Sequence, residues 1–168
     1  DLAVVNTISN SVSILKNNGD GSYSSKVDYM TGPDPRSVFI SGLDGDGDND
    51  LIVTNSNSSS NTVSILKNNG DGIFTTKVDY AVGSIPYSVF VCDLDKDGDV
   101  DLAVANEGTT TISILKNNGD GVFASKVDYN VGGNPIYIYM SDFDGDGVDD
   151  SVDAFPADKM KIVSEIDL

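Results

Sequence analysis

The feature of this sequence that most constrains its fold is an internal repeat of about 50 residues. The pentapeptide Asn-Asn-Gly-Asp-Gly begins at Asn17, Asn68 and Asn117, so its copies are 51 and 49 residues apart. Each copy follows Ser-Ile-Leu-Lys and precedes, after a short spacer, Lys-Val-Asp-Tyr. A second element, which begins at Asp1, returns at Asp50 and Asp101. Such similar copies are expected to share one backbone conformation and to pack mainly against their neighbours.

Each repeat is predicted to form four short antiparallel strands. In one copy the segments 88–91, 102–105, 111–115 and 124–129 are rich in β-branched and aromatic residues. Residues 102–105 are apolar without alternation, which is typical of a strand covered on both faces, whereas 111–115 alternates as in a half-buried strand. The glycines of the pentapeptide allow the positive φ angles of a hairpin turn. Four strands per repeat predict an all-β fold of β-propeller blades, and no helix is predicted before Asp158.

The strand count gives three four-stranded antiparallel blades' worth, circularly permuted. The expected blades are residues 1–37, which hold strands two to four, then 38–87 and 88–137, followed by a final strand and loop at 138–150. Residues 151–168 form a C-terminal tail. Propellers close with roughly 4 to 8 blades. The chain is therefore expected to be a partial propeller or half of an oligomeric ring, and one hypothesis is a homodimer that completes a six-bladed ring.

Two full aspartate-rich loops lie between the first and second strands of a blade and fit D-x-D-x-D-G-x-x-D. Calcium takes six to eight oxygen ligands, and carboxylates at alternate positions of a tight loop converge on one point. Position six is glycine for the sharp turn, position seven is expected to give its backbone carbonyl, and position nine closes the shell. Magnesium keeps more water and takes fewer protein ligands, which favours calcium. The predicted ligands are Asp93, Asp95, Asp97, Asp99 and Asp101 in one loop, and Asp142, Asp144, Asp146, Val148 and Asp150 in the other.

A third loop is incomplete because Gly42 stands where the first aspartate belongs. Its remaining predicted ligands are Asp44, Asp46, Asp48 and Asp50, and this site is expected to be weaker or to use water at position one. Asp1 matches position nine of a loop whose other residues are not in this sequence. We expect two to three calcium ions in total. The alternative for all these loops is a solvated Asp-Gly turn, although dense unpaired carboxylates repel one another.

Composition excludes several function classes. There are 27 acidic and 10 basic side chains, a net charge of −17, and a basic surface for nucleic acid or anionic lipid is not expected. No apolar run approaches the ~20 residues that span a bilayer, so no membrane insertion is predicted. Histidine is absent and Cys92 is the only cysteine, which excludes a Cys/His zinc site, an internal disulfide and a His-dependent triad.

Other recurrent residues have a structural and a functional interpretation. Asp20, Asp71 and Asp120 lie in the hairpins, where turn chemistry is favoured over metal binding. Tyr29, Tyr80 and Tyr129 recur once per blade and could stack on a ligand, but packing between blades is the favoured interpretation. Cys92 is expected to be a small apolar filler.

The aspartate loop followed by L-x-V-x-N and then by the L-x-N-N-G-D-G-x-F hairpin resembles the FG-GAP/VCBS repeat, the calcium-binding blade of integrin-α-like propellers. The resemblance covers residues 1 to about 150. It implies a β-propeller, calcium in the loop between a blade's first two strands, and a secreted or cell-surface setting. The segment after Asp150 departs from this pattern and resembles a thrombospondin type 3-like calcium segment. Asp153 then falls at position twelve from Asp142, as a further ligand or as the cap of a turn before Pro156.

These observations predict a calcium-binding structural, adhesion or scaffolding module of a secreted or surface protein, with no catalysis of its own. Calcium would neutralise the aspartates and stabilise each blade. The alternative is a carbohydrate-binding, lectin-like module or a non-catalytic part of a polysaccharide-degrading enzyme, because related repeats occur in such proteins. Nearly every aspartate is already assigned to a loop or turn, which argues against glycoside hydrolysis. A protein or glycan ligand is the expected partner besides calcium.

Overall fold

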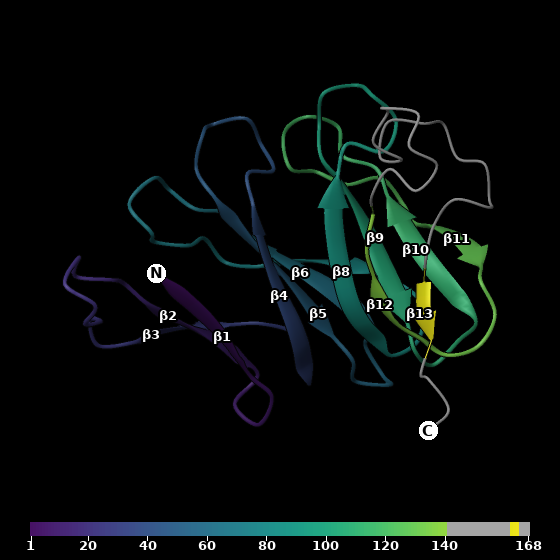
Figure 1. Cartoon of the computed structure of the whole chain (residues 1–168), viewed down its shortest axis with the longest axis horizontal. Coiled ribbons are helices and arrows are strands. Elements are labelled where there is room, and N and C mark those ends of the chain that lie inside the picture. Colours follow the sequence, from purple (N-terminus) through teal and green to yellow (C-terminus); the bar gives the residue numbers. More distant parts are fainter. Residues whose placement is uncertain (141–161, 165–168) are drawn as a thin grey trace.

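The computed structural model describes residues 1–140 and 162–164, and this part of the chain is all-β, without a helix (Figure 1). Three antiparallel sheets follow one another along the chain, and we call them blades one, two and three. Blade one contains β1 (Leu2–Asn6), β2 (Ser11–Leu15) and β3 (Val27–Met30). Blade two contains β4 (Pro35–Ser41), β5 (Asp50–Asn55), β6 (Thr62–Leu66) and β7 (Val78–Ala81), and blade three contains β8 (Pro86–Cys92), β9 (Asp101–Asn106), β10 (Thr111–Leu115) and β11 (Val127–Asn130). The predicted all-β fold of propeller-type blades is confirmed.

The predicted half-buried strand is wrong. In β10, Ser113 has no exposed surface although its neighbours Ile112 and Ile114 point to the opposite face. Blades pack on both faces of the sheet, so a serine in a middle strand is as buried as the isoleucines beside it. The continuous apolar run in β9 is buried throughout, as its sequence predicts.

A polar chain makes this burial of serine favourable, and it recurs in all three blades. In blade three, Asn106 Nδ2 donates to Ser113 Oγ at 3.0 Å, and Ser113 Oγ donates to Asp128 Oδ1 at 2.7 Å. Lys126 forms an ion pair with the same aspartate. The equivalent serines, Ser13 and Ser64, donate to their aspartates at 2.6 Å. A buried hydroxyl whose hydrogen bonds are made costs little, and one without them costs much more.

Apolar side chains between successive blades form the core. One cluster fills the space between blades two and three and includes Ile52, Val63, Val89 and Leu102. At the rim, Tyr29 of blade one meets Phe74 of blade two edge to face, with ring centroids 5.2 Å apart. Tyr80 and Phe123 repeat this contact between blades two and three at 5.4 Å. For these two tyrosines the predicted packing between blades is confirmed.

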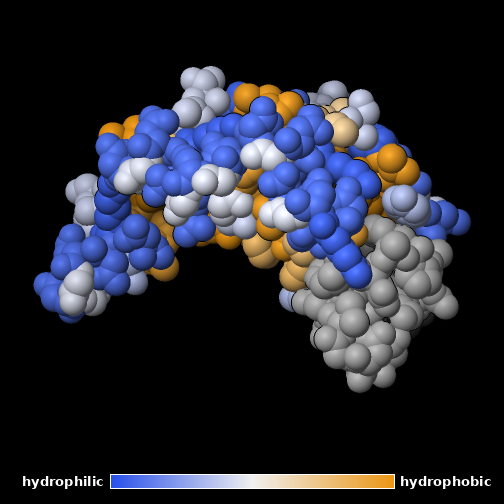
Figure 2. Space-filling model, turned by 90° about the horizontal axis from the view of Figure 1, so that it is seen from above, coloured by the Kyte–Doolittle hydropathy of each residue, from blue (hydrophilic) through white to orange (hydrophobic). Residues whose placement is uncertain are grey.

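The blades are arranged as an arch (Figure 2). The first strands of blades two and three lie side by side, because β4 contacts β8, and β8 in turn contacts β12 (Pro135–Ile138). Figure 2 views the end at which the hairpins and aspartate loops gather, and most of the described surface there is hydrophilic.

Cys92 packs with Met140 against the apolar cluster on the outer face of blade three, as expected of a small filler.

A strand that the sequence did not predict lies beyond blade three. β13 (Ile162–Ser164) pairs antiparallel with β12, and Pro135 lies opposite Ser164 with a register shift before Tyr137. In blade three Pro86 lies opposite Asn106 with the same shift before Ser88. The backbone of β13 therefore takes the place that a second strand has in a complete blade.

The polar chain predicts the effect of one substitution. Ser113→Ala should lower the free energy of unfolding by about 1–3 kcal/mol, because Asn106 and Asp128 lose a buried partner and the Gly83 amide loses its acceptor. Ser125→Ala, on the exposed approach to β11, should change it by less than about 0.5 kcal/mol. Urea unfolding of both variants measures these free energies, and equal effects would contradict the stabilising role of the hydrogen bonds from asparagine to serine to aspartate.

Candidate metal centre

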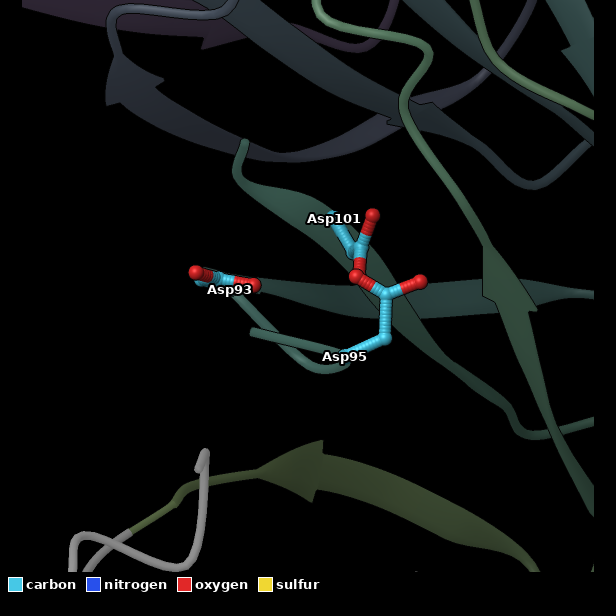
Figure 3. Close-up of side chains that lie close together, drawn as sticks. All are labelled: Asp93, Asp95 and Asp101. Carbon is cyan, nitrogen blue, oxygen red and sulfur yellow. The ribbon is translucent and has the colours of Figure 1, made fainter. Parts of the chain in front are cut away.

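Three carboxylates of the loop between β8 and β9 lie close together in blade three. One oxygen from each of Asp93, Asp95 and Asp101 lies within 4.8 Å of the others. In Figure 3 the carboxylates of Asp95 and Asp101 face each other and that of Asp93 lies beside them. Asp93 and Asp95 come from the loop, while Asp101 is the first residue of β9. This is the only such group among the residues that the structure describes.

The loop is shaped by its own aspartates and by two positive φ angles. Asp93 Oδ1 accepts a hydrogen bond from the Lys96 amide at 2.8 Å, and its Oδ2 accepts one from the Gly98 amide at 3.0 Å. Lys96 has a φ of 64° and Gly98 a φ of 96°. A left-handed residue at position six favours glycine, as the sequence pattern predicts. The backbone therefore turns tightly around the carboxylate of position one.

Asp101 joins this loop to the neighbouring hairpin. Its Oδ2 accepts the Leu94 amide at 3.1 Å, and its Oδ1 accepts the Asn117 amide at 2.8 Å. The side chain has no exposed surface. The position-nine aspartate thus has a structural role that the ligand assignment did not include, and any ion would share a carboxylate that already holds two backbone N–H groups.

Electrostatics distinguish the buried aspartate from the exposed one. Burial raises the pKa of Asp101 above its usual value, the two backbone hydrogen bonds oppose this rise, and repulsion from Asp95 and Asp97 adds to it. Asp95 has a lowered pKa, chiefly because Lys116 Nζ donates to its Oδ2 at 2.7 Å. A divalent cation between these groups would stabilise the ionised form of Asp101.

The other predicted ligands of this loop lie outside the cluster. Asp97 Oδ1 accepts the Asp99 amide at 2.9 Å, so it closes the next turn of the loop. The Asp99 side chain is turned toward the hairpin, where its Oδ2 is 2.7 Å from the position that a Cβ on Gly119 would take. Only the backbone of Asp99 can therefore serve the site, which is the role predicted for position seven.

The loop with Gly42 repeats the backbone arrangement without the cluster. Asp50 Oδ2 accepts the Leu43 amide at 2.9 Å and Oδ1 accepts the Asn68 amide at 2.8 Å, and burial raises its pKa as it does for Asp101. A Cβ on Gly42 would lie 3.1 Å from the Asp48 carbonyl oxygen. That carbonyl therefore faces the place of the missing first aspartate. Within residues 1–140, the structure does not bring Asp44, Asp46 and Asp50 together as a metal-binding group.

The remaining assignments divide in two. The second full loop, with Asp142, Asp144, Asp146, Val148 and Asp150, lies outside the described residues, as does Asp153. The hairpin aspartates are described, and each closes its own turn by accepting, through Oδ1, the backbone amide two positions further along the chain. Asp20 accepts the Ser22 amide in this way, and Asp71 and Asp120 accept the equivalent amides of their own hairpins. Asp1 Oδ1 accepts the Asn17 amide at 2.7 Å, as Asp50 and Asp101 do with their hairpins.

The residues present in blade three fit calcium. Every side-chain ligand in the group is a carboxylate oxygen, which is the ligand that hard cations select, and nitrogen and sulfur ligands are absent from it.

The part of the chain that the structure describes contains no helix long and apolar enough to cross a membrane.

Fold and site together define a protein of propeller-type blades with an acidic loop between the first and second strands of a blade. A family model for FG-GAP-like repeats matches residues 42–104 and 93–152, which together cover more than half of the chain. The chain belongs to the FG-GAP-like repeat family. The thrombospondin-like resemblance of the tail stays a prediction.

The chain is also similar to part of a solved Tc holotoxin pore from Photorhabdus luminescens, at 23% identity and a TM-score of 0.48. The similarity covers 88% of this chain and 7% of that one. A comparison with curated proteins gives no match.

The dual role of Asp101 predicts a difference between two loop substitutions. Asp101→Ala should lower the free energy of unfolding in chelator by about 2–4 kcal/mol, because the Leu94 and Asn117 amides lose their acceptor. Asp97→Ala removes another carboxylate of the same loop, but this carboxylate accepts only the exposed Asp99 amide. This substitution should lower the free energy of unfolding by less than about 0.5 kcal/mol. Denaturant unfolding without metal checks this, and a neutral Asp101→Ala would contradict the structural role.

Proposed function

We propose that this chain is a calcium-stabilised structural or adhesion module of a secreted or surface protein. The observation that carries the proposal is the group formed by Asp93, Asp95 and Asp101, in which an acidic, partly buried oxygen set lies on a loop fixed by its own backbone hydrogen bonds. Such preorganisation reduces the ordering that binding requires. Asp93, Asp95, Asp101 and the Asp99 carbonyl are the ligands of this proposed site. The Asp142 loop, which has the same pattern, is the proposed second site, and the Gly42 loop is a weaker third.

Calcium would act on stability and not on a reaction. Burial raises the pKa of Asp101, so ionisation of this carboxyl is less favourable in the fold than in water. An ion that neutralises Asp101 also supports the hydrogen bonds from that carboxylate to the loop and to the hairpin. Extracellular calcium modules bind at roughly 10⁻⁴–10⁻³ M, which suits a protein that meets abundant calcium outside the cell. The family resemblance supports the same secreted or surface setting.

We propose that the module has no catalytic activity, nucleic-acid partner or membrane insertion, and that its macromolecular partner is a protein or a glycan. The net charge of −17 supports the exclusion of nucleic acid. The carbohydrate-binding alternative loses two of its candidate stacking residues, since Tyr29 and Tyr80 pack against the phenylalanines of the next blade.

Calcium removal tests the main proposal. With free calcium at ten times its dissociation constant, one site adds about 1.4 kcal/mol of stability. This should raise the melting temperature by about 3–6 °C for a chain of this size. Calorimetric titration should count two ions or more, and Asp93→Asn should remove one of them. A melting temperature that chelator leaves unchanged would contradict the calcium function.

We further propose that two copies complete a six-bladed ring, with β12 of one copy beside β1 of the other. Within the described residues β1 has β2 on one edge and no strand on its other edge. β13 occupies the edge of β12 that such a pairing needs, so the dimer requires β13 to exchange for the second copy's β1.

Light scattering on a sizing column tests the ring. In millimolar calcium the dimer has twice the mass of 17.7 kDa. Val163→Pro should increase the dimer fraction, because proline disfavours the pairing of β13 with β12 and so opens the edge. A monomer in both proteins would contradict the ring.

A further inference from the structure

The lysine before the hairpin joins blade one to blade two, and blade two to blade three. Lys16 Nζ donates to the backbone carbonyl of Asp71, so blade one holds the hairpin of blade two. Lys67 Nζ donates to the carbonyl of Asp120, so blade two holds the hairpin of blade three in the same way. The repeat of this contact shows that it belongs to the junction between blades and not to one local surface.

Lys116 occupies the same position in blade three but has a different partner. Its Nζ lies 2.7 Å from Asp95 Oδ2, at position three of the aspartate loop in its own blade. Beyond blade three the described residues contribute β12 and β13 but no further hairpin of this sequence. The side chain that would hold a following hairpin is therefore bound to the candidate metal centre.

Lys67 shows an intermediate arrangement. While it donates to Asp120, its Nζ is also 3.3 Å from Asp44 Oδ2, which is position three of the loop in blade two. The hairpin of blade three covers this pair, because a Cβ on Gly121 would lie 2.8 Å from Lys67 Cε. The side chains of Lys67 and Asp44 are 33% and 16% exposed, against 58% and 29% for Lys116 and Asp95. A following hairpin thus covers the lysine and supplies it with a carbonyl.

The same hairpin also contacts the loop directly. Asn117 Nδ2 donates to the Leu43 carbonyl at 2.7 Å across the junction, and to the Val100 carbonyl of its own blade at 3.1 Å. The junction therefore places three elements against one another: the loop of one blade, the lysine of that blade, and the hairpin of the next.

We propose that Lys116 is the resident counter-cation of the Asp93 loop, that calcium displaces it from Asp95, and that this lysine position also binds the hairpin carbonyl of a following blade where one is present, as Lys67 does. The inference rests on the proposed calcium function and adds a regulator to that site. An ammonium group and a calcium ion on the same carboxylate repel each other, so the lysine beside Asp95 lowers calcium affinity. Without metal the same ion pair offsets part of the repulsion among the loop carboxylates.

Calcium titration by calorimetry tests the first part, in a background with Asp144→Asn and Asp146→Asn that weakens the other full loop. Lys116→Met should raise calcium affinity by about two- to five-fold, the range that an exposed ion pair controls. Lys116→Arg, which keeps the charge, should leave it unchanged. Lys126→Met is the matched control, because it removes the same charge and an ion pair with Asp128 from the same blade, away from the loop.

The second part is tested by Lys67→Met in the same background. This variant should lower the melting temperature in chelator by a few degrees, because blade two loses its bond to the Asp120 carbonyl, while the affinity of the Asp93 loop stays unchanged. Equal affinities for wild type, Lys116→Met and Lys126→Met would overturn the counter-cation role, as would an equal rise in both variants. If neither wild type nor variants bind calcium, the proposed function itself fails.

Discussion

The arrangement of the loop end depends on the buried aspartate that begins the second strand of blades two and three. Asp50 and Asp101 each accept one backbone N–H from the aspartate loop and one from the hairpin, and Asp1 keeps the hairpin bond alone. Without these acceptors, buried amides of two segments would be left without partners. The cost of this arrangement is a carboxylate whose burial opposes its ionisation, and a cation at the same place would offset that cost.

Charge at this end is balanced by lysine as well as by any metal. The lysine before the hairpin contacts the hairpin of the next blade in blades one and two, and the position-three aspartate of its own loop in blades two and three. In blade two it contacts both, and in blade three it contacts only the loop among the described residues. The proposed metal binding and the packing of blades would therefore act on the same side chain, so a change at one would affect the other.

A different interaction stabilises the body of each blade, namely the hydrogen bonds among buried polar side chains between apolar layers. The repeated hydrogen bonds from asparagine to serine to aspartate cross three strands of a sheet and pair the buried hydroxyls of Ser13, Ser64 and Ser113. The Oδ1 atoms of Asn55 and Asn106 and the hydroxyl of Ser88 are buried without a hydrogen-bond partner. The aromatic pairs Tyr29–Phe74 and Tyr80–Phe123 then join successive blades by edge-to-face contacts. Because every blade uses the same contacts with its neighbour, the chain forms an arch that further strands can extend.

The sequence by itself determined the repeat, the strands, the hairpin turns and the loop with Asp93, Asp95 and Asp101, because these follow from local alternation, glycine positions and carboxylate spacing. Tertiary structure decided the burial of Ser113, the two amide partners of Asp101, the choice of Lys116 between partners and the pairing of β13 with β12. Each of these joins residues well apart in the chain, the lysine contacts between blades by more than 50 positions. The sequence shows that the lysine recurs before each hairpin, but the group to which its Nζ binds depends on how neighbouring blades lie side by side.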